Sequence, residues 1–294
     1  MRRFLALAVV LVGTGLSAQV FRSSVLTVPV TVTVVDANGR LITGLTLQDF
    51  DVFEDGTLQT VTTFTNERVA VSLGVLLDVS DSMRGQKISD AGMAVEHFVS
   101  DLLRGEDEAF IGVFNHRPRL ASPWTRPPSS LKARLAEVTP TGGTAIYDAL
   151  VASAPMFEYR IHTRAALVVV SDGADTASDF TLRQARDVLR RTDPFVYAIA
   201  IDAPGALAST RVNPEALREI TGQSGGYTEV VRAAEDLGPA TERIANELNK
   251  QYVLGYVSSR APDDGWRAIR VKVKERNYFT RARRGYYAMR RINP

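Results

Sequence analysis

The sequence of 294 residues contains no cysteine. This absence excludes disulfide bonds, thiolate zinc sites, cysteine nucleophiles and the lipid-acceptor cysteine of a bacterial lipoprotein. A large excess of charge is also absent, because 35 basic and 33 acidic residues give a net charge of +2. We therefore expect no nucleic-acid partner. The apolar share of 45% and the charged share of 23% are ordinary for a soluble globular protein.

Long apolar runs are scarce, and the one at the N-terminus is short. Two arginines precede an uninterrupted apolar run at 4–12, and Leu16-Ser17-Ala18 offers a small-residue cleavage site. A membrane anchor is the competing interpretation, but the run is short for about 30 Å of hydrocarbon. We expect residues 1–18 to be a signal peptide. The mature protein is then exported, periplasmic or secreted, with no transmembrane segment.

Both ends of the mature chain show the hydrophobic period of two that is typical of strands. Val28, Val30, Val32 and Val34 alternate with their neighbours, and the same period returns after about residue 250. We predict a β segment at 19–68 and another at 251–294. A few strands are marginal by themselves, so we expect the two segments to pack together in one β-sandwich-like module. Two unrelated β appendages are the alternative.

The middle of the chain, 69–250, alternates between strand and helix patterns. The nearly continuous apolar run from Val69 to Leu77 is typical of a strand buried on both faces of a parallel sheet. The predicted fold class is α/β, a doubly wound and mostly parallel sheet inserted in the small β-sandwich-like module. Strands are expected at 70–77, 109–115, 165–171, 195–201 and 226–231, and helices at 86–103, 129–138, 145–157, 181–191, 213–221 and 234–249.

Three polar segments are placed where a parallel sheet binds ligands. Asp78-Val79-Ser80-Asp81-Ser82 and Ser171-Asp172-Gly173 directly follow predicted strands, and Thr141-Gly142-Gly143-Thr144-Ala145 precedes a helix. Loops at the carboxyl ends of parallel strands meet at one edge of the sheet. Each segment alone is an ordinary turn or helix cap. Together they present hard oxygen ligands suited to Mg²⁺ or Ca²⁺, and the predicted metal ligands are Asp78, Ser80, Ser82, Thr144 and Asp172.

Two further aspartates lie near these segments in the sequence. Asp148 comes one helical turn after Thr144, and Asp175 follows Asp172 by three residues. They could orient the ligands or their waters as a second layer around the ion. The alternative is that Asp148 is solvated near a helix start and that Asp175 caps a turn. The sequence leaves both interpretations open.

The order D-x-S-x-S, G-G-T and S-D-G resembles the metal-ion-dependent adhesion site (MIDAS) of von Willebrand factor A (VWA) domains. Asp78, Ser80 and Ser82 match its first loop, Thr144 its threonine and Asp172 its distal aspartate. The resemblance implies that the serines ligate directly, that the carboxylates often act through water, and that a Glu or Asp of a partner completes the coordination. Mg²⁺ is the expected ion, with Ca²⁺ or Mn²⁺ as alternatives. The flanks, at 45–56 and 252–287, are similar to those of exported bacterial VWFA-related proteins.

We therefore expect an exported, metal-dependent module for adhesion or scaffolding that binds a protein partner through an acidic residue. The alternatives are a structural envelope protein whose ion stabilises loops and, with less support, a metal-dependent hydrolase. No lysine or histidine is evident beside the site in the sequence, and the paired carboxylates of acid–base catalysis are missing. The G-x-S-x-G match at 222–226 has its helix and strand in the reverse order for a nucleophile elbow. We expect no enzymatic activity.

Overall fold

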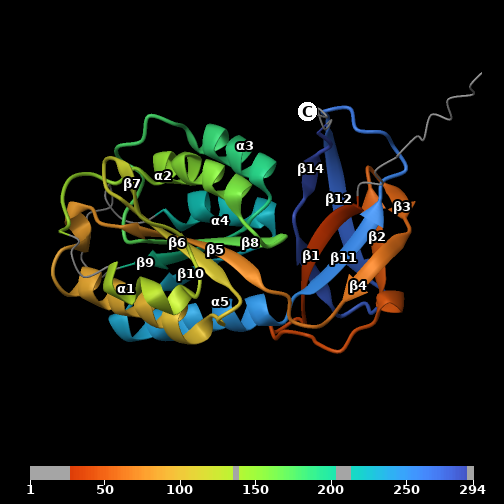
Figure 1. Cartoon of the computed structure of the whole chain (residues 1–294), viewed down its shortest axis with the longest axis horizontal. Coiled ribbons are helices and arrows are strands. Elements are labelled where there is room, and N and C mark those ends of the chain that lie inside the picture. The colour runs from red at the N-terminus through yellow and green to blue at the C-terminus, as the bar shows by residue number, and fades with distance from the viewer. Residues whose placement is uncertain (1–26, 135–138, 203–212, 290–294) are drawn as a thin grey trace, which may run out of the picture.

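The computed structural model describes residues 27–134, 139–202 and 213–289. The predicted signal peptide at 1–18 lies outside these residues. Two modules lie next to each other: a layered α/β module and an all-β module (Figure 1). Among the described residues, no helix has both the length and the apolar character needed to cross a membrane.

The α/β module is built on a six-stranded sheet with the order β10-β9-β8-β5-β6-β7. Its strands are β5 (Val71–Asp78), β6 (Glu108–Phe114), β7 (Pro118–Thr125), β8 (Arg164–Ser171), β9 (Phe195–Ile201) and β10 (Thr228–Val231). Every pairing is parallel except that of β7 with β6. β5 lies in the middle and is buried along its whole length. The apolar run from Val69 to Leu77 thus forms most of a strand that is covered on both faces.

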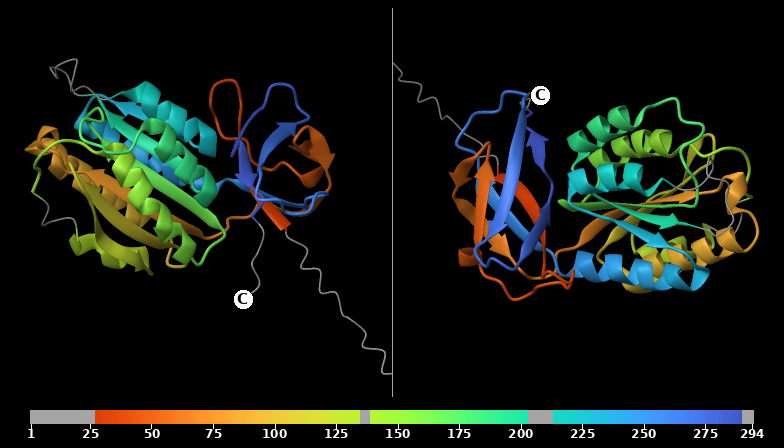
Figure 2. Two further views of the ribbon diagram at one scale, coloured as in Figure 1. Left: turned by 90° about the horizontal axis from the view of Figure 1, so that it is seen from above. Right: turned by 180° about the vertical axis from the view of Figure 1, so that it is seen from behind.

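Helices cover both faces of this sheet (Figures 1 and 2). Leu73, Val75 and Leu77 of β5 share a hydrophobic core with α1 (Gln86–His97) and α5 (Leu237–Asn249). Leu76 faces the other way, into a core with three further helices. These are α2 (Ile146–Ser153), α3 (Leu182–Thr192) and α4 (Pro214–Ser224). The alternation of side chains along one strand therefore supplies both cores.

The all-β module contains two four-stranded sheets with the orders β13-β1-β11-β4 and β14-β12-β2-β3. Its strands are β1 (Thr27–Val35), β2 (Phe50–Glu54), β3 (Thr57–Gln59), β4 (Val61–Thr65), β11 (Tyr252–Val257), β12 (Trp266–Val273), β13 (Phe279–Ala282) and β14 (Gly285–Tyr287). β1 pairs with β11 and β13, and β2 pairs with β12, all antiparallel. Each sheet contains strands from both ends of the chain, and they alternate in the first of the two sheets. This confirms the fold class, an α/β sheet inserted in a β-sandwich-like module.

Two elements differ from the prediction. The edge strand β7 was not predicted, because its segment contains Pro118 and Pro123 and only one of its eight residues is buried, so it lacks a strand-like apolar pattern. The helix expected at 129–138 is a 3-10 helix at Pro128–Arg134, and 135–138 lie outside the described residues. Both differences concern the periphery of the α/β module, away from its central strands.

A buried carboxylate on α5 joins the two modules. The Glu247 side chain is 3% exposed and accepts hydrogen bonds from Thr33 Oγ1 in β1 and the Tyr197 hydroxyl in β9, each at 3.0 Å. It also forms an ion pair with Arg281 in β13. Burial raises the pKa of Glu247, and the ion pair with Arg281 opposes that rise. One side chain thus receives hydrogen bonds from both modules.

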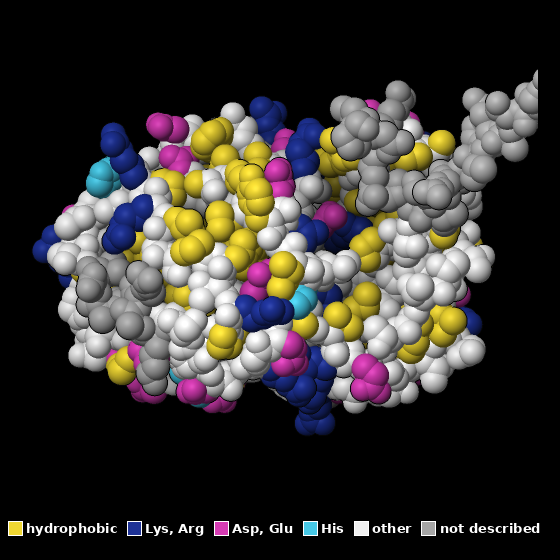
Figure 3. All heavy atoms as spheres, viewed as in Figure 1, with side chains coloured by type: hydrophobic (Ala, Val, Ile, Leu, Met, Phe, Trp, Pro, Cys, Tyr) yellow, Lys and Arg dark blue, Asp and Glu magenta, His cyan; other side chains and the backbone are white. Residues whose placement is uncertain are grey.

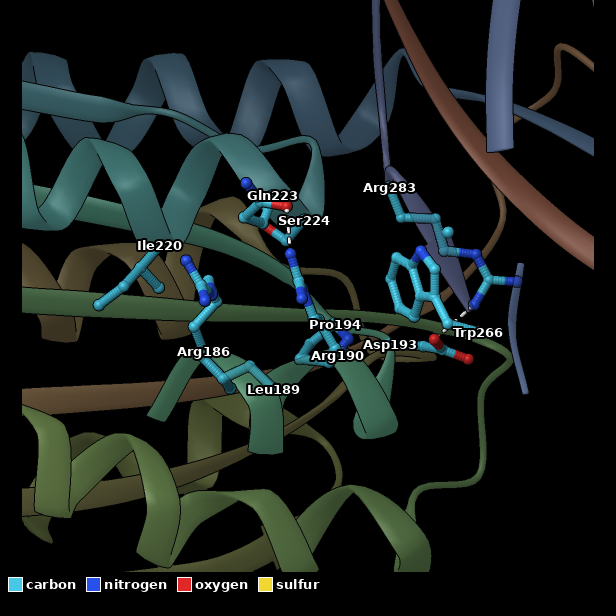
Figure 4. A pocket seen from close by; sticks show the side chains of 11 residues that line it. Arg186, Leu189, Arg190, Asp193, Pro194, Ile220, Gln223, Ser224, Trp266 and Arg283 are labelled. Atoms are coloured by element: carbon cyan, nitrogen blue, oxygen red, sulfur yellow. Dashed lines mark hydrogen bonds and ion pairs between the residues drawn. The ribbon is translucent and has the colours of Figure 1, made fainter. Parts of the chain in front are cut away.

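A second contact between the modules lies beside α3. The guanidinium of Arg190 stacks over the Trp266 ring at 5.0 Å, and Arg283 Nη1 lies 2.5 Å from Asp193 Oδ1 (Figure 4). Next to this contact the modules leave a hollow of about 520 Å³, whose lining includes Asp193, Arg283 and Tyr286. In the space-filling view the surface is hollowed between the two modules, and acidic and basic side chains lie in this hollow (Figure 3). Polar contacts therefore make up much of the junction.

We predict that Glu247→Ala lowers the free energy of unfolding by about 3 kcal/mol, because it leaves buried hydroxyls and Arg281 without their shared partner. Glu242→Ala is the control, since Glu242 lies on the same helix with a side chain 60% exposed. The control should change stability by less than about 0.5 kcal/mol. Urea unfolding measures both, and equal effects would contradict a special role for Glu247.

Candidate metal centre

The three predicted segments meet at the carboxyl ends of the central strands. β5 ends at Asp78 and pairs in parallel with β8, which ends at Ser171. The Thr141–Ala145 segment crosses beside the first loop. Thr141 N donates to Val79 O at 2.9 Å, and Asp81 N donates to Gly142 O at 2.9 Å. In Figure 1 these strand ends point away from the all-β module, so the site lies at the free end of the α/β module.

The side chains of the first and third loops form one continuous hydrogen-bonded chain. Asp78 Oδ2 accepts from the Ser171 hydroxyl at 2.6 Å, and Asp78 Oδ1 accepts from Ser80 N at 2.8 Å. The hydroxyls of Ser80 and Ser82 lie 3.0 Å apart. The Ser82 hydroxyl then donates to Asp172 Oδ1 at 2.7 Å. These hydrogen bonds therefore link four of the five predicted ligands: Asp78, Ser80, Ser82 and Asp172.

Thr144, the fifth predicted ligand, is buried against the loop that carries Asp172. Its Oγ1 lies so near Gly173 that a Cβ at that glycine would be 3.1 Å away. The backbone of Thr144 is also fixed, since its N–H donates to Thr176 Oγ1 at 3.0 Å and its carbonyl accepts from Thr176 N at 2.8 Å. A side chain at position 173 would crowd the threonine, which explains the glycine there.

The ionised form of Asp78 is unfavourable in the folded protein. Its side chain is fully buried, and this burial raises its pKa from 3.8 to about 6. The hydrogen bonds from Ser171 and Ser80 favour the charged form and limit the rise, whereas the nearby charge of Asp172 adds to it. A cation placed at this end of the sheet would relieve the cost of ionising Asp78.

Lys87 lies at the site, although no lysine was expected there. Its Nζ is 2.5 Å from Asp172 Oδ2 and 3.0 Å from the carbonyl oxygen of Ser82. Lys87 is the second residue of α1, which begins four residues after Ser82. The expectation that no lysine is near was therefore wrong. The sequence did contain a signal for this contact. A helix was predicted to start at residue 86, shortly after the Asp78–Ser82 loop, and this start places Lys87 in the first helical turn.

Asp148 and Asp175 hold the loop that follows Asp172. The Asp148 carboxylate accepts from the N–H groups of Asp179 at 3.1 Å and Phe180 at 2.9 Å. Asp175 accepts from Tyr147 N at 3.1 Å and from the Ser178 hydroxyl at 2.6 Å. These bonds tie the loop to the first turn of α2. A role of the two aspartates toward an ion stays a prediction.

The donor set of the site is oxygen only, with two carboxylates and three hydroxyls. This chemistry fits Mg²⁺ or Ca²⁺, which prefer hard oxygen ligands, and disfavours soft metals. Within the part of the chain that the structure describes, no cluster of three or more His, Asp or Glu side chains suited to a metal ion occurs. The candidate site does not form such a cluster because serine and threonine supply most of its donors. Ser82 is exposed, so the site is open to solvent.

Residues 73–174 match the family model of the von Willebrand factor type A domain. The fold and this match together define the class: the chain contains a VWA domain, as the order of its three loops predicted. Comparison with curated protein sequences gives no match.

Solved structures show the same fold at low sequence identity. BatB from Bacteroides thetaiotaomicron is 21% identical, with a TM-score of 0.52 over 62% of this chain and 98% of that one. A von Willebrand factor type A protein from Catenulispora acidiphila is 15% identical, with a TM-score of 0.55 over 92% and 65%. The vWF domain of the type V pili tip protein Mfa5 from Porphyromonas gingivalis is 14% identical, with a TM-score of 0.52 over 62% and 96%.

We predict that Asp78→Asn removes a pH-dependent cost from the metal-free protein. Because the pKa of Asp78 is raised in the folded state, ionising it lowers stability as the pH rises from about 4 to about 6, and the full cost is present above that range. Asparagine does not ionise. Relative to wild type, the variant should therefore gain about 1–3 kcal/mol between about pH 4 and about pH 7.5.

Urea unfolding in the presence of a chelator measures this difference. Asp81→Asn is the control, since Asp81 lies in the same loop with an exposed side chain. If the free energies of unfolding of Asp78→Asn and wild type differed by the same amount across this pH range, ionisation of Asp78 would not lower the stability of the fold.

Proposed function

We propose that this chain is an exported, metal-dependent protein-binding module. A divalent ion, Mg²⁺ before Ca²⁺ or Mn²⁺, is held by Asp78, Ser80, Ser82, Thr144 and Asp172, and a carboxylate of a protein partner completes its coordination. The convergence of these five oxygen-bearing side chains at one open edge of the sheet supports the proposal most directly. The match to the VWA family and the resemblance of the three loops to a MIDAS support the proposal further.

The donor set favours an acidic partner. Three of the five donors are neutral hydroxyls, so the ligands do not fully neutralise a divalent ion. When bound, the ion supplies a positive charge at the solvent-facing side of the site, where an outside carboxylate is attracted to it. The chain's own residues fix the loops, bury Asp78 and leave Ser82 accessible. Recognition, with no bond made or broken, is the activity that this arrangement supports.

The hydrogen bonds between the loops favour recognition over a purely structural ion. The Thr141–Val79 and Asp81–Gly142 backbone bonds, both at 2.9 Å, already join the second loop to the first. The bond from Ser82 to Asp172 joins the first loop to the third. Loops that are tied to each other in this way do not need an ion to hold them. We therefore propose binding rather than loop stabilisation, and no enzymatic activity.

The proposed location is the periplasm or the extracellular medium. The arginine-led apolar run at the N-terminus supports export. Two proteins of similar fold are an aerotolerance-related membrane protein from Bacteroides fragilis and the type V pili tip protein Mfa5, and they give this proposal further support. At 21% and 14% identity, the likeness of the present chain to these two proteins is one of fold.

We predict that isothermal titration calorimetry detects Mg²⁺ or Mn²⁺ binding to the wild-type protein and none to Asp78→Ala, which lacks the central carboxylate. Asp81→Ala is the matched control, because Asp81 lies in the same loop but pairs with Arg84 at the surface. It should bind the ion with a constant within about 3-fold of wild type, as expected for loss of a weak surface ion pair. Equal heats for wild type and Asp78→Ala would contradict the metal assignment.

We also predict that capture of the partner depends on the ion while the fold does not. In a crosslinked pull-down from the native envelope, a chelator and the Asp78→Ala substitution should each remove the same partner band. The melting temperature of the wild-type protein should change little with chelator. A large loss of thermal stability with an unchanged partner band would instead support a loop-stabilising ion. Metal-dependent turnover of model phosphoesters or esters would support a hydrolase.

A further inference from the structure

Lys87 occupies an unfavourable position for a cation. It is the second residue of α1, and the N-terminus of a helix carries a partial positive charge that disfavours lysine. The first turn of this helix contains no acidic residue that would offset the repulsion. The contacts that stabilise Lys87 must therefore come from outside the helix. They come from the loops that carry Ser82 and Asp172.

Asp172 and Ser82 supply these contacts. The ammonium group lies 2.5 Å from Asp172 Oδ2 and 3.0 Å from Ser82 O. The Asp172 side chain is only 1% exposed, and its other oxygen accepts the Ser82 hydroxyl. A carboxylate buried to this degree is costly without a charged partner. Lys87 therefore supplies the positive charge that Asp172 needs in the absence of an ion.

The Asp172 carboxylate that pairs with Lys87 belongs to the predicted ligand set, and so does the hydroxyl of Ser82, whose carbonyl oxygen contacts Lys87. A divalent ion held by Ser82 and Asp172 would lie close to the ammonium group, and two cations at that separation repel each other. Taking the proposed metal site as given, we infer that Lys87 is a built-in competitor for the ion, pairing with Asp172 in its absence and leaving when it binds. The metal affinity of the site is then set by Lys87 as well as by the five ligands.

Lys87 has an easy route out of the site. Its side chain is 34% exposed, and its flexible stem and strongly hydrated ammonium group suit a move into water. Competition of this kind weakens ion binding without blocking it. It also couples the ion to the partner, because a partner's carboxylate can attract the displaced ammonium group as well as the ion. By linkage, a partner that raises metal affinity is itself bound more tightly when the metal is present.

A positioning role for Lys87 predicts the opposite effect. If the ammonium group only oriented Asp172 for the ion, its removal would weaken metal binding. If it competes with the ion, its removal strengthens metal binding. The sign of the change in affinity therefore separates the two roles.

The test is Mn²⁺ titration of wild type, Lys87→Gln and Arg84→Gln by calorimetry. Both substitutions remove one positive charge from the same short segment, but Arg84 is 64% exposed and pairs with Asp81 outside the ligand set. Lys87→Gln should bind Mn²⁺ about 10-fold more tightly than wild type, which corresponds to about 1.4 kcal/mol. Arg84→Gln should stay within about 2-fold, as expected for a screened surface charge.

Thermal unfolding gives a second measurement. Metal-free Lys87→Gln leaves Asp172 without its cation, so saturating Mn²⁺ should raise its melting temperature by more than it raises that of wild type. If Lys87→Gln does not fold by circular dichroism, Lys87→Met keeps the length of the stem and takes its place.

An unchanged or weaker Mn²⁺ affinity in the Lys87 variant would overturn the competitor role and leave the metal site standing. If neither wild type nor any variant binds Mn²⁺, the metal site fails and the competitor role fails with it. Tight binding by the Lys87 variant alone would support both.

Discussion

A carboxyl group at the end of a strand that is covered on both faces cannot reach water, and Asp78 lies in that position at the end of β5. Hydrogen bonds from neighbouring groups must therefore replace its hydration. They come from the Ser171 hydroxyl of the adjacent strand and from Ser80 N of its own loop. The bond from Ser171 joins the first loop to the third, and the bond from Ser80 N fixes the turn of the first loop itself. The need to satisfy one buried charge therefore determines much of the geometry of the candidate site.

The same buried charge is the physical reason for proposing a cation at this site. Burial raises the pKa of Asp78, and Asp172 adds a second carboxylate close by. Lys87 compensates Asp172 from the first turn of α1. Asp78 has hydrogen bonds but no such ion pair among the described residues. The proposed divalent ion would supply the positive charge that Asp78 lacks. Its position at the free end of the α/β module leaves room for a partner.

Much of the fold and of the candidate site could be predicted from the sequence. Continuous apolar runs revealed the central strands, and the placement of polar residues directly after these runs revealed the loops that meet at the sheet edge. Lys87 was missed because its role depends on the direction in which α1 leaves the metal loop. The junction at Glu247 was missed because its partner Thr33 is 214 residues away in the sequence. The edge strand β7 was missed because packing against β6, rather than its own pattern, makes it a strand.

Whether these loops hold a divalent ion can be decided by locating the ion in a crystal. Anomalous diffraction from crystals of the protein grown with Mn²⁺ identifies the ion by its element and places it among the residues. We expect one strong peak bounded by the side chains of Asp78, Ser80, Ser82, Thr144 and Asp172, with the Lys87 ammonium group moved away from Asp172. No peak at this edge of the sheet at saturating Mn²⁺, with Lys87 still paired to Asp172, would contradict it.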